Sequence, residues 1–284
     1  MSKVGIVTDS TSCLPPDLVR EYDIRIVPAT FSIDGKSYMD QVDISSDEFW
    51  RLFKGAKQMP TTGAISPGAF VNTFTELAES TDSILCILVS KALSAINESA
   101  VQGRDMMQSR YPNLNIEIID SKISTGAMGF IVLEAARAAW EGKSLHEVAR
   151  VAQDMIPRVK FVVAMETLKY LIKTGRAPKT AHIGNVLQVK PMIGMVSGTG
   201  EVESVGRVRG KRKAMEKLVD MVGDYIDTSK PIHLMVHYTD RFEEGEELKR
   251  LAISRYDCAE VYLTSYTPVM ASATGPVLCL AFYS

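Results

Sequence analysis

Two adjacent threonines, Thr61 and Thr62, precede a predicted helix start. Ser66 followed by Pro67 is typical of an N-cap and a first helical position. The first N–H groups of a helix have no partner within the helix and carry the positive end of its dipole, so they favour an anion. Hydroxyl groups beside such an end could complete a binding site for a carboxylate or phosphate. The same residues also suit an ordinary loop and a capped helix that bind nothing.

Polar side chains also follow two apolar, strand-like runs. Asp9 and Ser10 come after residues 4–7, and Ser94 comes after residues 83–89. In α/β sheets, ligands bind at the carboxyl ends of the strands, which makes these groups candidate ligand contacts. A turn or a helix cap is the alternative explanation for Asp9 and its neighbours.

The composition argues against several classes of protein. The net charge is −2 and 23% of the 284 residues are charged, so a nucleic-acid or polyanion binder is not indicated. No apolar run approaches the 18 residues of a membrane span, and we expect no stable membrane insertion and a cytoplasmic location. The four cysteines are scattered without a CxxC pair, which predicts reduced thiols.

Three kinds of site lack their sequence signal. His233 and His237 are four residues apart on a strand-like run, and about 13 Å of extended chain prevents them from sharing a metal ion. The nucleophile elbow of a serine hydrolase, Gly-x-Ser-x-Gly, is absent from the sequence. The glycines lack the GxGxxG and GxxxxGK spacings of nucleotide sites. We therefore predict no catalytic residue, no metal and no cofactor.

Strand-like and helix-like segments alternate along the chain, which predicts an α/β fold. Apolar runs at 4–7, 83–89 and 116–120 are separated by helical stretches, as in a mainly parallel βαβ sheet. The later part of the chain is richer in strand signals, above all over 186–208, and predicts a mixed sheet with helices. We expect two α/β domains, at 1–157 and 158–284.

Shorter signals predict local details. Residues 24–31 read as one strand, followed by a tight hairpin turn at Asp34-Gly35. Ser144 and Glu147 have the spacing of a capping box. The small residues of 271–277 indicate a loop before a final apolar strand. Two basic segments, which contain Arg176, Arg207 and Arg209, suit a solvated face or contact with an acidic or phosphate-bearing partner.

Several of these segments together resemble the DegV family of bacterial proteins, and the resemblance covers essentially the whole chain. The sequence reads TDS at 8–10, PTT at 60–62 and SP at 66–67, where the family has TDS and PTTSQPSP. Residues 89–94 with Ser99-Ala100 resemble the family stretch SSxLSGTYQSA. The segments at 171–176 and 190–207 resemble further family stretches.

The resemblance implies a protein that binds one long-chain fatty acid between two α/β domains and is not itself an enzyme. A separate kinase subunit, similar to dihydroxyacetone kinases, would phosphorylate the bound carboxylate with ATP. Thr62 and Ser94 match the carboxylate-binding Thr and Ser of the family, and the loop near 60–66 would reach the site between the domains. Arg176, Arg207 and Arg209 become candidates for contact with the kinase or with the acyl phosphate.

The sequence departs from the family at the headgroup. The family segment His-Thr-Gly-Pro-Gly appears here as residues 273–277, so Ala273 stands in place of the histidine and Thr274 follows it. Tail burial is worth on the order of 10 kcal/mol and one charge-assisted hydrogen bond about 1.5–3 kcal/mol, so we expect acyl binding to survive this change. Two alternatives stay open: a binding protein for a different amphiphile, and an enzyme acting on a small carboxylate or phosphate metabolite.

Overall fold

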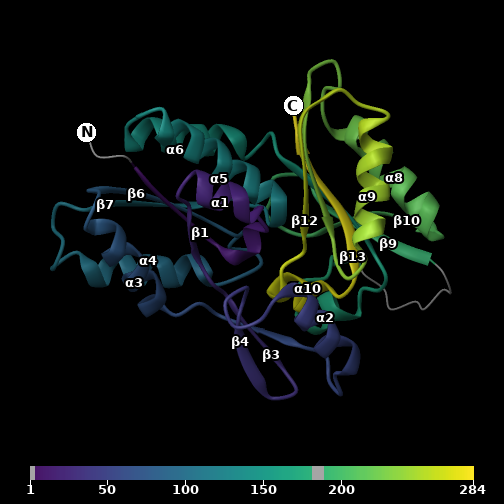
Figure 1. The fold of residues 1–284 in the computed structure, drawn as a ribbon, viewed down its shortest axis with the longest axis horizontal. Coiled ribbons are helices and arrows are strands. Elements are labelled where there is room, and N and C mark those ends of the chain that lie inside the picture. Colours follow the sequence, from purple (N-terminus) through teal and green to yellow (C-terminus); the bar gives the residue numbers. More distant parts are fainter. Residues whose placement is uncertain (1–3, 181–188) are drawn as a thin grey trace.

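The computed structural model describes residues 4–180 and 189–284, which form three β-sheets with helices packed around them (Figure 1). The first sheet is parallel and has the strand order β2-β1-β6-β7. The inner strand β6 is almost entirely buried, as its apolar sequence predicts for a strand covered on both faces. The strands are β1 (Gly5–Asp9), β2 (Arg25–Val27), β6 (Ser83–Leu88) and β7 (Asn115–Asp120).

Helices cover both faces of this sheet. In Figure 1, α3 and α4 lie below it, α5 and α6 lie above it, and the short helix α1 follows β1. The predicted N-caps are confirmed: the Ser66 hydroxyl accepts a hydrogen bond from the Ala69 N–H at 3.3 Å, and Ser144 forms a capping box with Glu147. The helices are α1 (Pro16–Glu21), α3 (Pro67–Ala78), α4 (Ile96–Met107), α5 (Thr125–Trp140) and α6 (Leu145–Met155).

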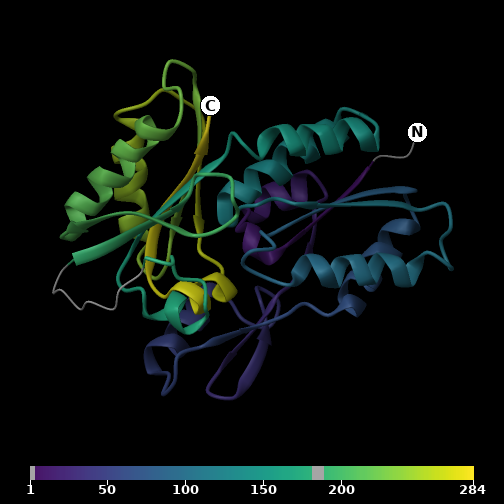
Figure 2. The same ribbon diagram turned by 180° about the vertical axis from the view of Figure 1, so that it is seen from behind.

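The second sheet has six strands in the order β10-β9-β8-β13-β11-β12 and mixed directions, as predicted. Helices α8 and α9 cover its outer face (Figure 2). Positions 186–188 of the predicted β-rich stretch lie outside the described residues. The elements are β8 (Lys160–Met165), β9 (Val189–Met195), β10 (Glu203–Arg209), α8 (Lys211–Tyr225), β11 (Ile232–Tyr238), α9 (Phe242–Ile253), β12 (Cys258–Ser265) and β13 (Val277–Tyr283).

Helix α5 joins the two sheets. It packs against β1 and β6 of the parallel sheet and against β8, β11 and β13 of the mixed sheet. Thirteen residues of this 16-residue helix are buried, which explains why its sequence is apolar on every side rather than amphipathic. One hydrophobic core therefore runs through both halves of the molecule.

A small third sheet corrects two predictions. Residues 24–31 do not form one strand: β2 ends at Val27 and β3 (Thr30–Ile33) begins after Pro28, which has no N–H for a ladder. The expected hairpin at Asp34-Gly35 does connect β3 to β4 (Lys36–Met39). The segment near 60–66 is not all loop, because β5 (Thr61–Gly63) pairs with β3 and places Thr62 opposite Phe31.

The expected loop at 271–277 is also wrong in part. Residues 268–274 form the helix α10 (Pro268–Thr274), with Pro268 at its first position. Alanine is the best helix former, so the small residues that resemble a loop in the sequence continue the turn that Pro268 begins. Two further helices, α2 (Ser46–Gly55) and α7 (Lys169–Lys173), flank α10 and the small sheet (Figure 1).

Candidate functional site

A pocket lies where the three sheets meet, and its walls come from all of them. Its non-atom space, including the part open to solvent, measures about 730 Å³. The parallel-sheet half contributes the ends of β1 and β6 and the starts of α4 and α5. The mixed-sheet half contributes β8 and β9, together with α7 and α10. From the latter half come Phe161, Val163, Ile193, Met195, Val269 and Met270.

Most residues that line the pocket are apolar, and a minority are polar or charged. Of its 21 described residues, 14 are aliphatic, glycine, Phe or Met, six carry a hydroxyl, and one, Arg176, is charged. The hydroxyl-bearing residues are Thr11, Thr62, Ser94, Ser124, Tyr266 and Thr274. An apolar cavity with one cation and a few hydroxyls is suited to an amphiphile with an anionic or polar head.

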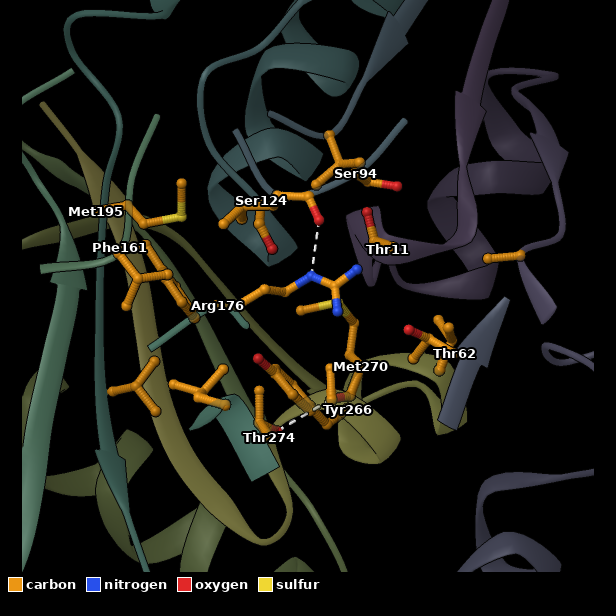
Figure 3. A pocket seen from close by; sticks show the side chains of 18 of the residues that line it. Thr11, Thr62, Ser94, Ser124, Phe161, Arg176, Met195, Tyr266, Met270 and Thr274 are labelled. Carbon is orange, nitrogen blue, oxygen red and sulfur yellow. Dashed lines mark hydrogen bonds between the residues drawn. The ribbon is translucent and has the colours of Figure 1, made fainter. Parts of the chain in front are cut away.

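Arg176, which the resemblance made a candidate for contact with the kinase or with the acyl phosphate, lines this pocket. Its Nε donates a hydrogen bond to the Leu93 carbonyl at 2.7 Å, next to Ser94. In the view of Figure 3, the guanidinium group points into the cavity, toward the side where Thr11, Ser94 and Thr62 lie. Neither terminal nitrogen has a hydrogen bond or ion pair among the described residues. Loss of solvent lowers the pKa of Arg176, and no carboxylate among the described residues forms an ion pair that would oppose this shift.

Two helix starts also face the pocket. Ser94 and Ile96 line it at the beginning of α4, and Ser124 lines it as the N-cap of α5. Within the part of the chain that the structure describes, neither helix has a side-chain cap hydrogen bond. The sequence pointed instead to α3, but Ser66 caps that helix and is not part of the lining. The anion-favouring helix ends are therefore those of α4 and α5.

Asp9 and Ser10 lie behind the pocket wall and do not line it. The buried Asp9 carboxylate accepts hydrogen bonds from the Thr11 N–H at 2.9 Å and the Val89 N–H at 3.0 Å. Burial raises the pKa of Asp9, and these hydrogen bonds oppose that shift. The Ser10 hydroxyl accepts from the Ala29 N–H at 3.1 Å. Both side chains thus fix the backbone of residues that do line the pocket.

Asp40 was not found from the sequence, although it holds one wall of the site. This buried carboxylate accepts a hydrogen bond from the Val269 N–H at 3.0 Å, at the start of α10. Burial raises the pKa of Asp40 to about 7, against hydrogen bonds from Ser10, Val269 and Thr267. No local pattern marks it, because its partner is 229 residues away.

The remaining predicted residues divide into two groups. Thr62, Ala273 and Thr274 line the pocket together with Ser94. Thr61 is exposed on β5 and does not line it. Arg207 and Arg209 are exposed on β10, an edge strand of the mixed sheet, and are not in the lining either.

Tyr266 is a lining residue that the sequence did not indicate. Its side chain is 1% exposed, and in Figure 3 its hydroxyl points into the cavity beside Thr274. Burial raises the pKa of Tyr266 well above its ordinary value, so the phenol keeps its proton. A single aromatic residue before a Thr-Pro pair gives no sequence pattern that would distinguish a pocket-lining tyrosine from a tyrosine in the core.

The histidines of β11 have structural contacts. His237 Nε2 accepts a hydrogen bond from the Gly126 N–H at 3.1 Å, in the first turn of α5. Burial lowers the pKa of His237 to about 3, so the ring is neutral. His233 Nδ1 lies 2.7 Å from Glu260. Within residues 4–180 and 189–284, no group of His, Cys, Asp and Glu has the arrangement of a metal site, and no helix is long and apolar enough to cross a membrane.

Comparison with known proteins gives a consistent result. The model of the DegV family matches residues 3–284. A DegV domain-containing protein from Caldanaerobacter subterraneus is 39% identical over 251 residues, which are 88% of this chain and 87% of that one. A fatty-acid-binding DegV family protein from Thermus thermophilus is 28% identical, with a TM-score of 0.89 over all of both chains. A stearic-acid-binding protein from Eubacterium ventriosum is 26% identical, with a TM-score of 0.90 over 100% of this chain and 98% of that one.

Proposed function

The chain belongs to the DegV family, and we propose that it binds one long-chain fatty acid in the pocket between its sheets. The single observation that carries this proposal is the described lining: apolar walls, a group of hydroxyls and one guanidinium that has no ion pair with any described residue. The fatty-acid binding described for the relatives from Thermus thermophilus and Eubacterium ventriosum supports it.

The tail supplies most of the affinity in this proposal. Phe161, Val163, Ile193 and Met195 offer an apolar surface, and flexible Met195 can adapt to a kinked or straight chain. Burying the methylenes of a C16 chain is worth on the order of 10 kcal/mol before the cost of association. The carboxylate then lies at the polar side of the pocket, where Thr62 and Ser94 are its hydroxyl ligands.

The second part of the proposal is presentation of the carboxylate to a kinase. A separate subunit similar to dihydroxyacetone kinases would transfer the phosphoryl group, and this chain would hold the acyl substrate. Arg207 and Arg209 project from an edge strand and have no ion pair among the described residues, so they are available to an acidic or phosphate-bearing surface. The proposal includes the predicted division into an N-terminal domain, residues 1–157, and a C-terminal domain, residues 158–284, with the ligand between them.

Organic extraction of the purified full-length protein, followed by mass spectrometry, tests the ligand. We expect one fatty acid per chain. A different lipid at the same stoichiometry would support the alternative of another amphiphile, which the loss of a polar side chain at Ala273 favours. Extraction of no lipid, together with no binding of added hexadecanoate, would contradict the proposal.

Kinase coupling has its own test. The double substitution Arg207→Glu and Arg209→Glu should reduce kinase-dependent acyl-phosphate formation at least about 10-fold, because like charges at an interface oppose association. Hexadecanoate binding should stay unchanged, since neither residue lines the pocket. Unchanged acyl-phosphate formation would remove both residues from the interface.

A further inference from the structure

A second hollow, which we call the acidic groove, lies where α1, the segment 40–48 and the ends of β11 and β12 meet. Its non-atom space, including the part open to solvent, measures about 1730 Å³. The hydroxyls of Ser46 and Ser265, which both line it, are 3.3 Å apart and join the start of α2 to the end of β12. Among the described residues, none lines both the acidic groove and the pocket between the sheets. The acidic groove is therefore a separate feature of the surface.

The walls of the acidic groove are largely apolar. Val42 is 63% exposed, and Phe242, whose ring meets that of Tyr238 edge-on at 5.4 Å, is 51% exposed. Apolar side chains that are exposed around one hollow, rather than singly, indicate a surface that a partner covers. The apolar and aromatic lining residues are Leu14, Pro16, Val19, Ile26, Pro28, Val42, Ile44 and Tyr238.

The charged part of the acidic groove is negative. Arg20 is the one cation among its described lining residues, and it forms an ion pair with Asp17. Four acidic residues line the groove, and none of them has an ion pair within the described ranges. A surface of one sign attracts a partner of the opposite sign. The four are Asp40, Asp43, Asp47 and Glu48, of which the last three are exposed.

Asp40 is the buried member of this set. It is 1% exposed, and its Oδ1 accepts the hydrogen bond from the Val269 N–H. The hydroxyls of Ser10 and Thr267 are close to the carboxyl group, but in the part of the chain that the structure describes no well-formed hydrogen bond reaches Oδ2. A buried carboxylate oxygen without a donor is unfavourable, and a cation held in the acidic groove would offset that cost.

We propose that the acidic groove binds a segment of a partner protein that carries Lys or Arg beside aliphatic or aromatic residues. The apolar walls would cover the apolar side chains of the segment, and the carboxylates would attract its cations. The groove lies at the β12 edge of the mixed sheet, whereas Arg207 and Arg209 lie on the opposite edge strand, β10. This site is therefore distinct from the basic surface proposed for the kinase, and it does not depend on the bound lipid.

Fluorescence anisotropy with three labelled peptides tests the proposal on the full-length protein. The first has Lys and Leu at the spacing of an amphipathic helix. In the second Ser replaces Leu, which removes the apolar side chains, and in the third Glu replaces Lys, which reverses the charge. Wild-type protein should bind the Lys/Leu peptide at least about 10-fold more tightly than either of the others, because binding needs both apolar contact and opposite charge.

Val42→Lys tests the apolar wall. It removes an apolar contact and adds a like charge, so it should weaken binding of the Lys/Leu peptide at least about 10-fold. Met106→Lys is the matched control, because Met106 on α4 is also 63% exposed and does not line the acidic groove. This control should keep the wild-type affinity.

The carboxylates are tested by neutral substitutions. Asp47→Asn combined with Glu48→Gln should weaken binding of the Lys/Leu peptide about 2- to 10-fold and reduce its dependence on salt. Asp40→Asn keeps an oxygen for the Val269 N–H and should weaken binding about 2- to 5-fold. Glu76→Gln combined with Glu79→Gln removes the same charge from exposed positions at the end of α3 and should change neither the affinity nor its salt dependence.

Failure of the wild-type protein to bind the Lys/Leu peptide, or equal affinity for the three peptides, would overturn the proposal. Wild-type affinity in Val42→Lys, or in both sets of neutral substitutions in the acidic groove, would overturn it as well. Analytical ultracentrifugation of the protein alone examines a second copy as the occupant. A dimer that Val42→Lys dissociates and Met106→Lys preserves would assign the acidic groove to self-association instead of a basic partner.

Discussion

Two half-buried arginines in this molecule have opposite surroundings. Arg137, on α5, donates to both carboxylate oxygens of Glu260, at 3.1 and 2.6 Å, and to Glu134 at 2.6 Å. Arg176 has no carboxylate partner among the described residues. A guanidinium that is paired with carboxylates of the same chain holds the fold together. A guanidinium without such a partner is available to a ligand. The contrast separates the structural polar groups from the functional ones.

The ion-pair cluster around Arg137 lies between the two halves of the chain. Glu260 on β12 also accepts a hydrogen bond from Tyr262 at 2.6 Å, and Tyr283 on β13 donates to Glu134 at 3.0 Å. This cluster ties α5 to the mixed sheet, at the opposite end of the helix from Ser124 in the pocket. It therefore sets the position of the helix that carries one pocket wall.

The largest expected effect is that of Arg137→Gln on stability. Removing this guanidinium leaves Glu260 and Glu134 partly buried without their cation, and we expect the free energy of unfolding to fall by about 3 kcal/mol. Arg176→Gln should change the stability of the ligand-free protein by less than about 0.5 kcal/mol or raise it. Urea unfolding of both delipidated variants measures this difference. Equal losses of unfolding free energy in the two variants would contradict the distinction between the two arginines.

A smaller effect is the acid sensitivity of the same cluster. Burial alone would raise the pKa of Glu260, but hydrogen bonds from His233, Arg137 and Tyr262 lower it to about 2. Because the folded-state pKa lies below the unfolded-state value near 4.5, the stabilisation is present above pH 4.5 and is lost as the pH falls toward 2. The loss should be at most about 2 kcal/mol, since the side chains are partly exposed. Urea unfolding at several pH values should show a steeper loss in wild type than in Glu260→Gln.

The smallest effects concern helix caps. Ser66→Ala removes the cap of α3 and should lower the free energy of unfolding by about 1 kcal/mol without affecting hexadecanoate binding. Ser124→Ala should lower it by less than about 0.5 kcal/mol, because the Ser124 side chain makes no cap hydrogen bond. Thermal unfolding of the two variants gives the comparison. A larger loss for Ser124→Ala would show that this side chain is structural.

The sequence predicted the elements whose signals are local. The start of α3 at Ser66-Pro67, the capping box at Ser144 and the apolar strand β6 each depend on residues within a few positions of one another. Helix α10 was missed because Ala, Ser and Thr suit a loop and a short helix alike, and the buried Asp40 that holds its first turn is distant in sequence.

The site was predictable only in part, because a pocket is made by tertiary contacts. Family resemblance pointed to Thr62, Ser94, Ala273 and Thr274, and all four line the pocket. The roles of the others depend on what surrounds them. Arg176 is basic in the sequence whether it faces solvent or the pocket. What distinguishes it from Arg137 is that it has no carboxylate partner in the described ranges.

The most direct test of the account is the ionisation of the bound headgroup. Hexadecanoate labelled with ¹³C at its carboxyl carbon is bound to the delipidated protein, and its chemical shift is followed by NMR as the pH is lowered. Contact with the Arg176 guanidinium should keep the bound carboxylate ionised at pH values below the pKa of the free acid. A bound carboxyl group that titrates at higher pH than the free acid would show that the headgroup is buried without a cation, and would contradict the account.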